Sequence, residues 1–223
     1  GRCQHPCMTV IDELLDLLLP TRCALCDALG SSICSKCVGD LLFERTEVVR
    51  EALVGVVAAR YGDKEKKLLH AFKENGQTSL ATHLAEPLAV ILREWSPSLQ
   101  RPILVPVPSS RDNYKKRGFM PTKLLGKRVC KQSGQACDLV DSLRFHRNVF
   151  DQAHLDSGAR RANLAGSMSS DTRVSGRQII ILDDVVTTGS TILEAARAVA
   201  AAGGTVVGFL GFAETILKTA SKT

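Results

Sequence analysis

Two neighbouring carboxylates and a run of hydroxyl side chains form the first group of residues that could do chemistry together. Asp183 and Asp184 follow an apolar segment that begins at Ile179, and a loop of small residues comes directly after them. Paired carboxylates can accept hydrogen bonds from the two adjacent hydroxyls of a sugar. Hydroxyl side chains and free backbone N–H groups at the start of a helix favour a phosphate group. The segment therefore predicts a site for a sugar monophosphate, with the phosphate held by Thr187, Thr188, Gly189, Ser190 and Thr191.

The commoner phosphate-binding motifs are absent from the sequence. There is no G-x4-G-K-[ST] run, which would place a lysine on β and γ phosphates, and no G-x-G-x-x-G fingerprint. A monophosphate beside a sugar diol is thus the ligand that the residues favour. The alternative is a solvated acidic turn followed by an ordinary helix start that binds no ligand.

Four of the eight cysteines form a second group with chemical potential. They occur as two C-x2-C pairs separated by seven residues, namely Cys23, Cys26, Cys34 and Cys37. At this spacing the thiolates can converge on one tetrahedral Zn²⁺ with no open position, so we expect a structural site. So short a segment buries too little apolar surface to fold without a metal. Four free thiols, or two short disulfides, are the alternative.

The elements that must position these groups alternate along the chain. We predict strands at 54–61, 103–108, 178–183 and 205–212, and helices at 63–74, 79–95, 124–131 and 190–202. Alternating strands and helices indicate an α/β fold with a parallel sheet and flanking helices. Ligands of such sheets bind at the carboxyl ends of the strands. The acidic pair is expected there, where its strand leaves the sheet.

Two polar segments lie between the predicted strands. Residues 111–131 contain eight Lys or Arg and one Asp, in a chain of net charge +6. This local field suits a polyphosphate or a nucleic acid. Residues 144–170 are polar and unusually long for a connection, so they are either disordered or a lid that closes over the ligand.

The N-terminal part is expected to be a small appended module. We predict a disordered tail at 1–7, a helix and a four-cysteine zinc module at 8–46, a main domain at 47–216 and a disordered tail at 217–223. The helix expected from Met8 to Leu19 carries acidic residues, unlike a signal peptide. No apolar stretch is long enough to span a bilayer. Metal-binding cysteines fit a reducing compartment, so we expect a cytoplasmic protein.

Taken in order, these segments resemble the ComF (competence protein F) family, a zinc-bearing branch of the type I phosphoribosyltransferases. The segment from Ile179 to Thr191 is similar to the phosphoribosyl pyrophosphate signature of those enzymes. The other matching pieces are the four-cysteine module, Leu104–Pro108, Arg117–Phe119, Gln152 with Leu155, and Arg160–Arg161 with Asn163.

The resemblance implies a role for each of these residues. Asp183 and Asp184 would be the catalytic residues that hold the ribose hydroxyls, and the loop after them would bind the 5′-phosphate. Mg²⁺ would accompany the diphosphate ligand. Contacts to pyrophosphate, or from a lid, are implied for Ser109, Ser110, Arg111, Arg117, Gln152, Arg160 and Arg161. The chain departs from many relatives in having Met120-Pro121 after Phe119 and Ser109-Ser110 in place of a histidine.

Three functions are compatible with this resemblance. The first is an enzyme that transfers a phosphoribosyl group from phosphoribosyl pyrophosphate to an unknown base. The second is a non-catalytic ComF-type protein that handles single-stranded DNA during uptake and works with a helicase-like competence ATPase. The third is a nucleotide sensor on the same fold. Aromatic side chains that could stack on bases lie among basic residues at Tyr114, Phe119, Phe145 and Phe150.

Overall fold

The computed structural model describes residues 21–95, 99, 101–134, 137–147 and 162–215. It divides the chain into two compact units, Gly1–Leu41 and Leu42–Thr223. Several sequence predictions lie outside the described residues: the helix at 8–19, the tails at 1–7 and 217–223, and the site candidates Gln152, Arg160 and Arg161.

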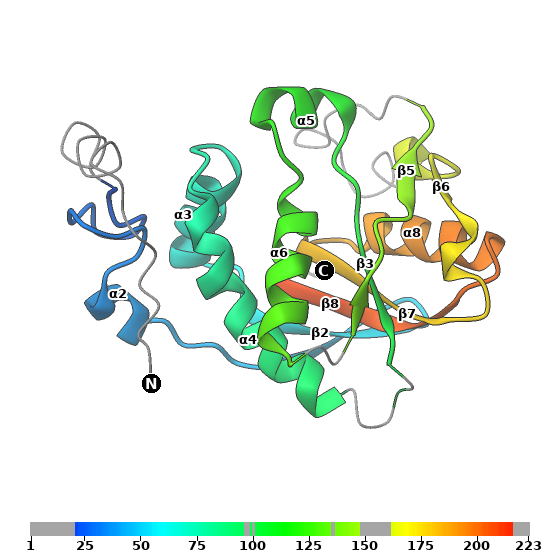
Figure 1. The fold of residues 1–223 in the computed structure, drawn as a ribbon, viewed down its shortest axis with the longest axis horizontal. Helices are drawn as coiled ribbons and strands as arrows, with labels where there is room; N and C mark the ends of the chain where they lie inside the picture. Colours follow the sequence, from blue (N-terminus) through cyan, green and yellow to red (C-terminus); the bar gives the residue numbers. More distant parts are fainter. Residues whose placement is uncertain (1–20, 96–98, 100, 135–136, 148–161, 216–223) are drawn as a thin grey trace, which may run out of the picture. The chain divides into compact units, whose positions relative to one another are not determined.

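A six-stranded sheet forms the centre of the larger unit (Figure 1). Its spatial order is β1-β2-β8-β7-β3-β4, and every neighbouring pair is parallel except the β1–β2 hairpin. The strands are β1 (Thr46–Arg50), β2 (Leu53–Arg60), β3 (Ile103–Pro106), β4 (Asp138–Leu139), β7 (Gln178–Val186) and β8 (Thr205–Glu214). The α/β class with a mostly parallel sheet is therefore confirmed.

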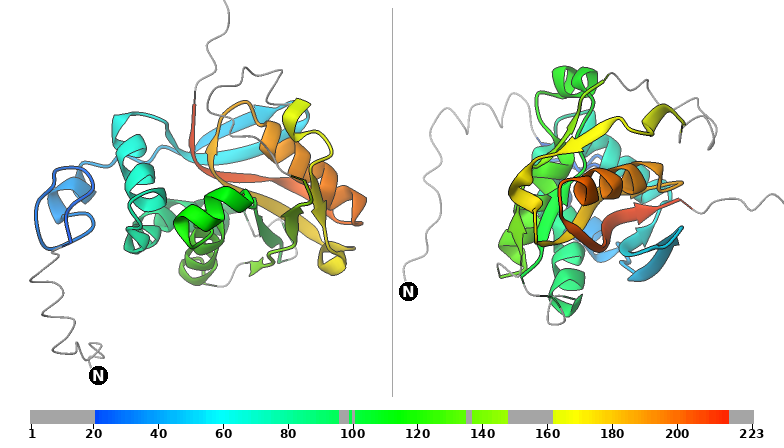
Figure 2. Two further views of the ribbon diagram at one scale, coloured as in Figure 1. Left: turned by 90° about the horizontal axis from the view of Figure 1, so that it is seen from above. Right: turned by 90° about the vertical axis from the view of Figure 1, so that its right-hand side faces the viewer.

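Helices cover both faces of this sheet (Figures 1 and 2). The described helices between β2 and β8 include α3 (Asp63–Lys73), η1 (Thr78–Leu80), α4 (Ala81–Trp95), α5 (Arg111–Arg117), α6 (Pro121–Gln132) and α8 (Ser190–Ala201), and of these α5 stands apart from the sheet (Figure 1). Side chains of β7 alternate between the two faces, as the period of a strand requires. Ile179 and Ile181 pack in one core with Ile192 of α8. Leu182 faces α6, where a Cβ atom on Gly126 would stand 3.1 Å from its Cδ2.

A second, two-stranded antiparallel sheet is formed by β5 (Leu143–Phe145) and β6 (Met168–Ser170), and η4 (Thr172–Val174) follows it. Glu194 of α8 fastens the start of β6, because its carboxylate accepts hydrogen bonds from the N–H groups of Gly166 (3.1 Å) and Met168 (2.9 Å). Part of the segment 144–170 is thus a hairpin anchored to α8. The segment 148–161 between these strands lies outside the described residues.

Sequence reasoning missed two elements near the site. β1 has a mixed polar sequence that does not alternate strongly, and it forms the antiparallel edge of the sheet. Residues 111–117, where the sequence predicted a basic segment without a helix, form helix α5, whose first turn is capped by Ser110. None of its residues is buried, so it shows no apolar periodicity. None of the described helices has the length and apolar character needed to cross a bilayer.

Candidate functional site

The acidic pair lies on β7 beyond the end of the neighbouring strand β3. The β3–β7 pairing ends where Pro106 stands opposite Leu182. On the other side, β8 continues to pair with β7 as far as Val186 opposite Glu214. The strand therefore does not leave the sheet at Asp183, as the sequence predicted, because β8 holds it for three more residues.

The two carboxyl groups are held by different partners. Asp183 Oδ1 accepts a hydrogen bond from the backbone N–H of Asp184 (2.8 Å), and Asp184 Oδ1 pairs with Lys73 Nζ of α3 at 2.7 Å. Burial and the adjacent Asp184 carboxylate raise the pKa of Asp183 to about 7, against the opposing effects of Lys73 and the Asp184 N–H. A carboxyl group that titrates near neutrality is typical of functional sites.

The loop after β7 forms the start of α8. Gly189 has φ +82°, a left-handed conformation that a side chain disfavours, and its carbonyl accepts the helical bond from Leu193 N (2.9 Å). The Thr188 and Ser190 hydroxyls lie 2.9 Å apart. The first N–H groups of any helix lack partners within it, and the helix dipole favours an anion there. The loop predicted from the sequence thus lies directly at the start of α8, where a helix favours an anion.

Arg50 of β1 supports this loop and was not found from the sequence. Its Nε donates to the Thr187 carbonyl (3.0 Å), and its Nη2 pairs with Glu214 Oε2 of β8 (3.1 Å). The Arg50 and Glu214 side chains are only 12% and 15% exposed. The guanidinium thus joins β1 and β8 to the loop. The sequence offers no signal for it, because the contact depends on the β1–β2 hairpin.

The residues after β3 that are predicted to contact pyrophosphate, Ser109 to Arg111, begin one strand away from the acidic pair. After β3, Val107 N still donates to the Leu182 carbonyl (2.9 Å), so the chain leaves the sheet beside β7. Ser109 and Ser110 are partly buried, and Ser110 Oγ accepts a hydrogen bond from Asn113 N (3.3 Å) as the cap of α5. Arg111 is exposed at the first position of α5.

Arg117, another pyrophosphate candidate, is already engaged by a carboxylate. It pairs with Glu74, which directly follows α3, and Lys116 pairs with the same carboxylate at 3.0 Å. Burial opposes the ionisation of Glu74, but hydrogen bonds from Lys116 and Arg117 lower its pKa. The structure therefore brings α5 and the end of α3 together through a cluster of charges.

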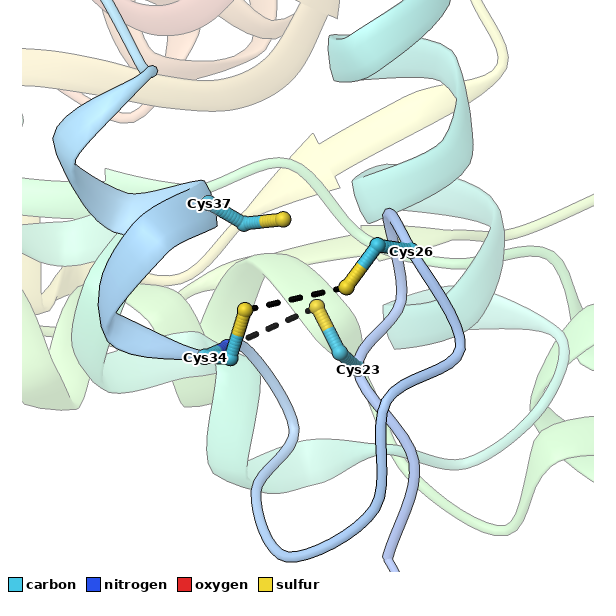
Figure 3. Close-up of side chains that lie close together, drawn as sticks. All are labelled: Cys23, Cys26, Cys34 and Cys37. Carbon is cyan, nitrogen blue, oxygen red and sulfur yellow. Dashed lines mark hydrogen bonds between the residues drawn. The ribbon is translucent and has the colours of Figure 1, made fainter.

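The four predicted metal ligands form a cluster in the smaller unit (Figure 3). The first pair lies in a short turn closed by the bridge between Arg22 and Leu29, and the second pair lies at the start of α2 (Ser35–Gly39). All four Sγ atoms lie within 4.8 Å of one another. Cys26 Sγ and Cys34 Sγ are 3.7 Å apart, close to the separation of about 3.8 Å that tetrahedral Zn–S bonds of about 2.3 Å require.

The backbone around the cluster favours a thiolate. Cys34 N–H donates to Cys23 Sγ at 3.4 Å. Burial opposes the ionisation of Cys23, but backbone N–H groups of Cys34, Cys26 and Leu25 lower its pKa to about 6. Hydrogen bonding with Cys26, burial and the other thiols raise the pKa of Cys37 to about 12. The cluster can hold a metal ion, which would bind the four cysteines as thiolates in place of their protons.

Comparison with known proteins agrees with the loop-and-sheet geometry. Residues 115–219 match the phosphoribosyl transferase domain family. The match includes the acidic pair, the loop 187–191 and α8. It begins within α5 and does not extend to the four-cysteine cluster.

Curated relatives match parts of the chain of different lengths. DNA utilization protein YhgH of Salmonella typhimurium is 34% identical over 133 residues, which are 58% of this chain and 58% of that protein. The match thus spans less than two thirds of that relative's length. Orotate phosphoribosyltransferase of Pyrobaculum islandicum is 43% identical over 47 residues, or 21% of this chain and 24% of that enzyme. A solved adenine phosphoribosyltransferase is 14% identical, with a TM-score of 0.42 over 79% of this chain and 88% of that one.

Proposed function

We propose that the site at the end of β7 binds phosphoribosyl pyrophosphate or a nucleotide and that the protein transfers the phosphoribosyl group to a base. The observation that supports this most is that two binding groups follow one another along one chain segment. The acidic pair on β7 offers acceptors for ribose hydroxyls, and the loop through Gly189 offers donors for the 5′-phosphate at the start of α8. The family match covers both parts.

The proposed reaction breaks the bond between ribose C1′ and the diphosphate oxygen. A ring nitrogen of the acceptor base forms the new bond to C1′ and loses its proton to solvent or to the departing diphosphate, which leaves with the electron pair of the broken bond. Mg²⁺ bound to the diphosphate would disperse the charge of the leaving group. The chain's own contribution is to orient the ribose and phosphate, and to exclude water from a cationic ribose centre.

Ser109, Ser110 and Arg111 are the described residues proposed to contact the diphosphate. They follow β3 at the edge of the sheet where Asp183 lies, since β3 and β7 are parallel neighbours. Arg111 is exposed and α5 has three further basic residues in its last turn. Arg117 joins this group only if the ligand draws it away from Glu74.

Zinc is the metal that we propose for the four-cysteine cluster. Four sulfur ligands at tetrahedral spacing favour Zn²⁺ and leave no coordination position for a substrate. The role is therefore structural. We propose the cytoplasm as the compartment of this protein. Its reducing conditions would keep these cysteines available to bind a metal as thiolates.

Handling of single-stranded DNA is the second candidate function. One observation favours it: the curated relatives that match more than half of this chain are named DNA utilization proteins. The basic exposed face of α5, with Tyr114 half exposed, offers phosphate contacts and a base-stacking group. A helicase-like ATPase partner stays an implication of the ComF resemblance.

One titration and one assay separate these functions. Isothermal calorimetry with phosphoribosyl pyrophosphate and Mg²⁺ should show saturable binding, and pyrophosphate release should appear with one member of a panel of purine and pyrimidine bases. Binding without release for any base would favour the sensor or the DNA function. Absence of binding would refute the proposed site. Single-stranded DNA that competes with the ligand, and loses affinity steeply with salt, would place both on one surface.

A further inference from the structure

The C-terminal end of α3 reaches two parts of the candidate site at once. Phe72 packs against Phe119, which follows α5, with ring centroids 5.8 Å apart. Lys73 pairs with Asp184, and Glu74 pairs with Lys116 and Arg117. Three consecutive residues of one helix end thus contact the acidic pair on one side and the basic helix on the other.

Lys73 differs from the other lysines of α3. Its Nζ lies 2.7 Å from Asp184 Oδ1, and the two side chains are 22% and 11% exposed. Lys66 and Lys67, on the same helix, are exposed to solvent. An ion pair withdrawn from water gains little net stability, because desolvation of the two charges offsets their attraction. Stability alone is therefore a weak reason for this lysine to lie here.

The charges around the acidic pair give a better reason. Asp183 and Asp184 are sequence neighbours, and Lys73 is the cation that opposes the burial and the repulsion acting on Asp183. Among the described residues, Arg50 of β1 and Glu214 of β8 also lie at this end of β7, and they pair with each other beside the Thr187 carbonyl. Their charges balance, so Lys73 is the cation that compensates the two carboxylates.

We propose that Lys73 is a positioning residue of the phosphoribosyl site, which holds Asp184 in place and favours the ionised form of Asp183 that binds ribose hydroxyls. Hydrogen bonds to an ionised carboxylate are roughly twice as strong as those to a neutral group. The lysine also offsets the repulsion between these carboxylates and the phosphates of the ligand. This inference rests on the proposed function, in which the carboxylates bind ribose.

Lys73→Gln tests the inference, with Lys67→Gln as the matched control on the exposed face of α3. Affinity for phosphoribosyl pyrophosphate with Mg²⁺ is measured by calorimetry from pH 6 to pH 9. At each pH the variant is compared with the unaltered protein, so the titration of the ligand cancels. A rise of about one unit in a carboxyl pKa makes its ionised form about tenfold rarer at lower pH.

We expect Lys73→Gln to bind about fivefold more weakly at pH 7, where Asp183 is about half ionised in the unaltered protein, and the deficit to shrink towards pH 9, where Asp183 is ionised in both proteins. Lys73→Arg should restore most of the affinity, and Lys67→Gln should bind normally. A deficit of the same size at every pH would mean a merely structural role and would overturn the proposal. Unchanged affinity of Lys73→Gln would overturn it equally.

A second measurement does not depend on the ligand. Carbon-13 NMR titration of the Asp183 carboxyl group in the free protein should give a higher pKa in Lys73→Gln than in the unaltered protein. If the unaltered protein fails to bind phosphoribosyl pyrophosphate, the proposed function fails, while this titration still reports how Lys73 acts on Asp183. Identical Asp183 titrations in the two proteins would contradict the role of Lys73.

Discussion

The side chain of Arg50 lies directly against Gly189, so that a Cβ atom at position 189 would stand 2.7 Å from Arg50 Cγ. The same arginine donates to the Thr187 carbonyl. Arg50 of β1 thus contacts the loop at two places. The loop residue that lies against the arginine side chain is a glycine. Two features favour glycine at position 189: its positive φ, and the lack of space for a Cβ atom beside Arg50.

Gly189→Ala should therefore damage the loop more than an ordinary glycine substitution would. Gly176→Ala is the matched control, because Gly176 also has a positive φ (+67°) but has open space around its Cα. The left-handed conformation costs each variant about 1–2 kcal/mol, and only Gly189→Ala must also displace Arg50. We expect the larger loss of unfolding free energy, and a loss of phosphate affinity, in Gly189→Ala alone. Equal effects in urea melts and phosphate titrations would argue against the close contact.

Arg50→Ala should weaken the same loop from the other side. The substitution leaves the Glu214 carboxylate, which is 15% exposed, without its cation. Removing one partner of a hydrogen-bonded ion pair that is largely buried costs on the order of 2 kcal/mol. We expect a comparable loss in urea unfolding, together with weaker phosphate binding. Recovery of stability in the double variant Arg50→Ala/Glu214→Gln would support the pairing, and a stability unchanged in Arg50→Ala would contradict it.

Asp183→Asn should increase the stability of the protein at high pH and at the same time abolish ribose binding. The folded-state pKa of Asp183 is raised to about 7 from the ordinary value of 3.8. The folded protein therefore holds this proton more tightly than the unfolded chain, and stability falls as pH rises from about 4 to about 7. At pH 8 the neutral amide avoids this cost. We expect Asp183→Asn to be more stable than the unaltered protein at pH 8, with little gain at pH 4, and to lose ribose binding. Urea melts that show no gain at pH 8 would refute the raised pKa.

The cysteine cluster predicts about one zinc per chain. Cys34→Ser should reduce the zinc content and the thermal stability of the 21–41 segment, because a ligand of the closed site is lost. Cys130→Ser is the control, since Cys130 lies on α6 and pairs with Cys137 outside the cluster. Metal analysis of the purified protein and hydrogen exchange before and after chelation provide the readout. Zinc content unchanged in Cys34→Ser would exclude the assignment.

The part of the site that is contiguous in sequence could be predicted. It consists of segments that follow one another along the chain, namely the strand from Gln178, the acidic pair, the loop and α8. Their residue types and order therefore indicate the chemistry without knowledge of the fold. The cysteine cluster was equally accessible, because its spacing specifies its geometry. The parallel sheet follows from the alternation of strands and helices.

The residues that support the site could not be predicted in this way. Arg50 and Thr187 are 137 positions apart and meet only because β1 folds back on β2, which in turn pairs with β8. In the sequence, nothing distinguishes Lys73 from the other lysines of α3. Its ion pair with Asp184 becomes apparent only when the fold places the end of α3 beside β7. Helix α5 escaped prediction because its residues are all exposed or half-buried, so only its Ser110 cap marks it.

The most direct test of the central claim compares Asp184→Asn with the unaltered protein in two calorimetric titrations, one with ribose 5-phosphate and one with inorganic phosphate. The claim assigns the ribose hydroxyls to the carboxylates and the phosphate to the loop. Asp184→Asn removes a negative charge and leaves Lys73 unpaired, so it should not weaken an anion in the loop. We predict that affinity for ribose 5-phosphate falls about tenfold, as loss of a charge-assisted hydrogen bond implies, while affinity for inorganic phosphate is retained. Equal losses for both ligands, or no loss for either, would contradict the account.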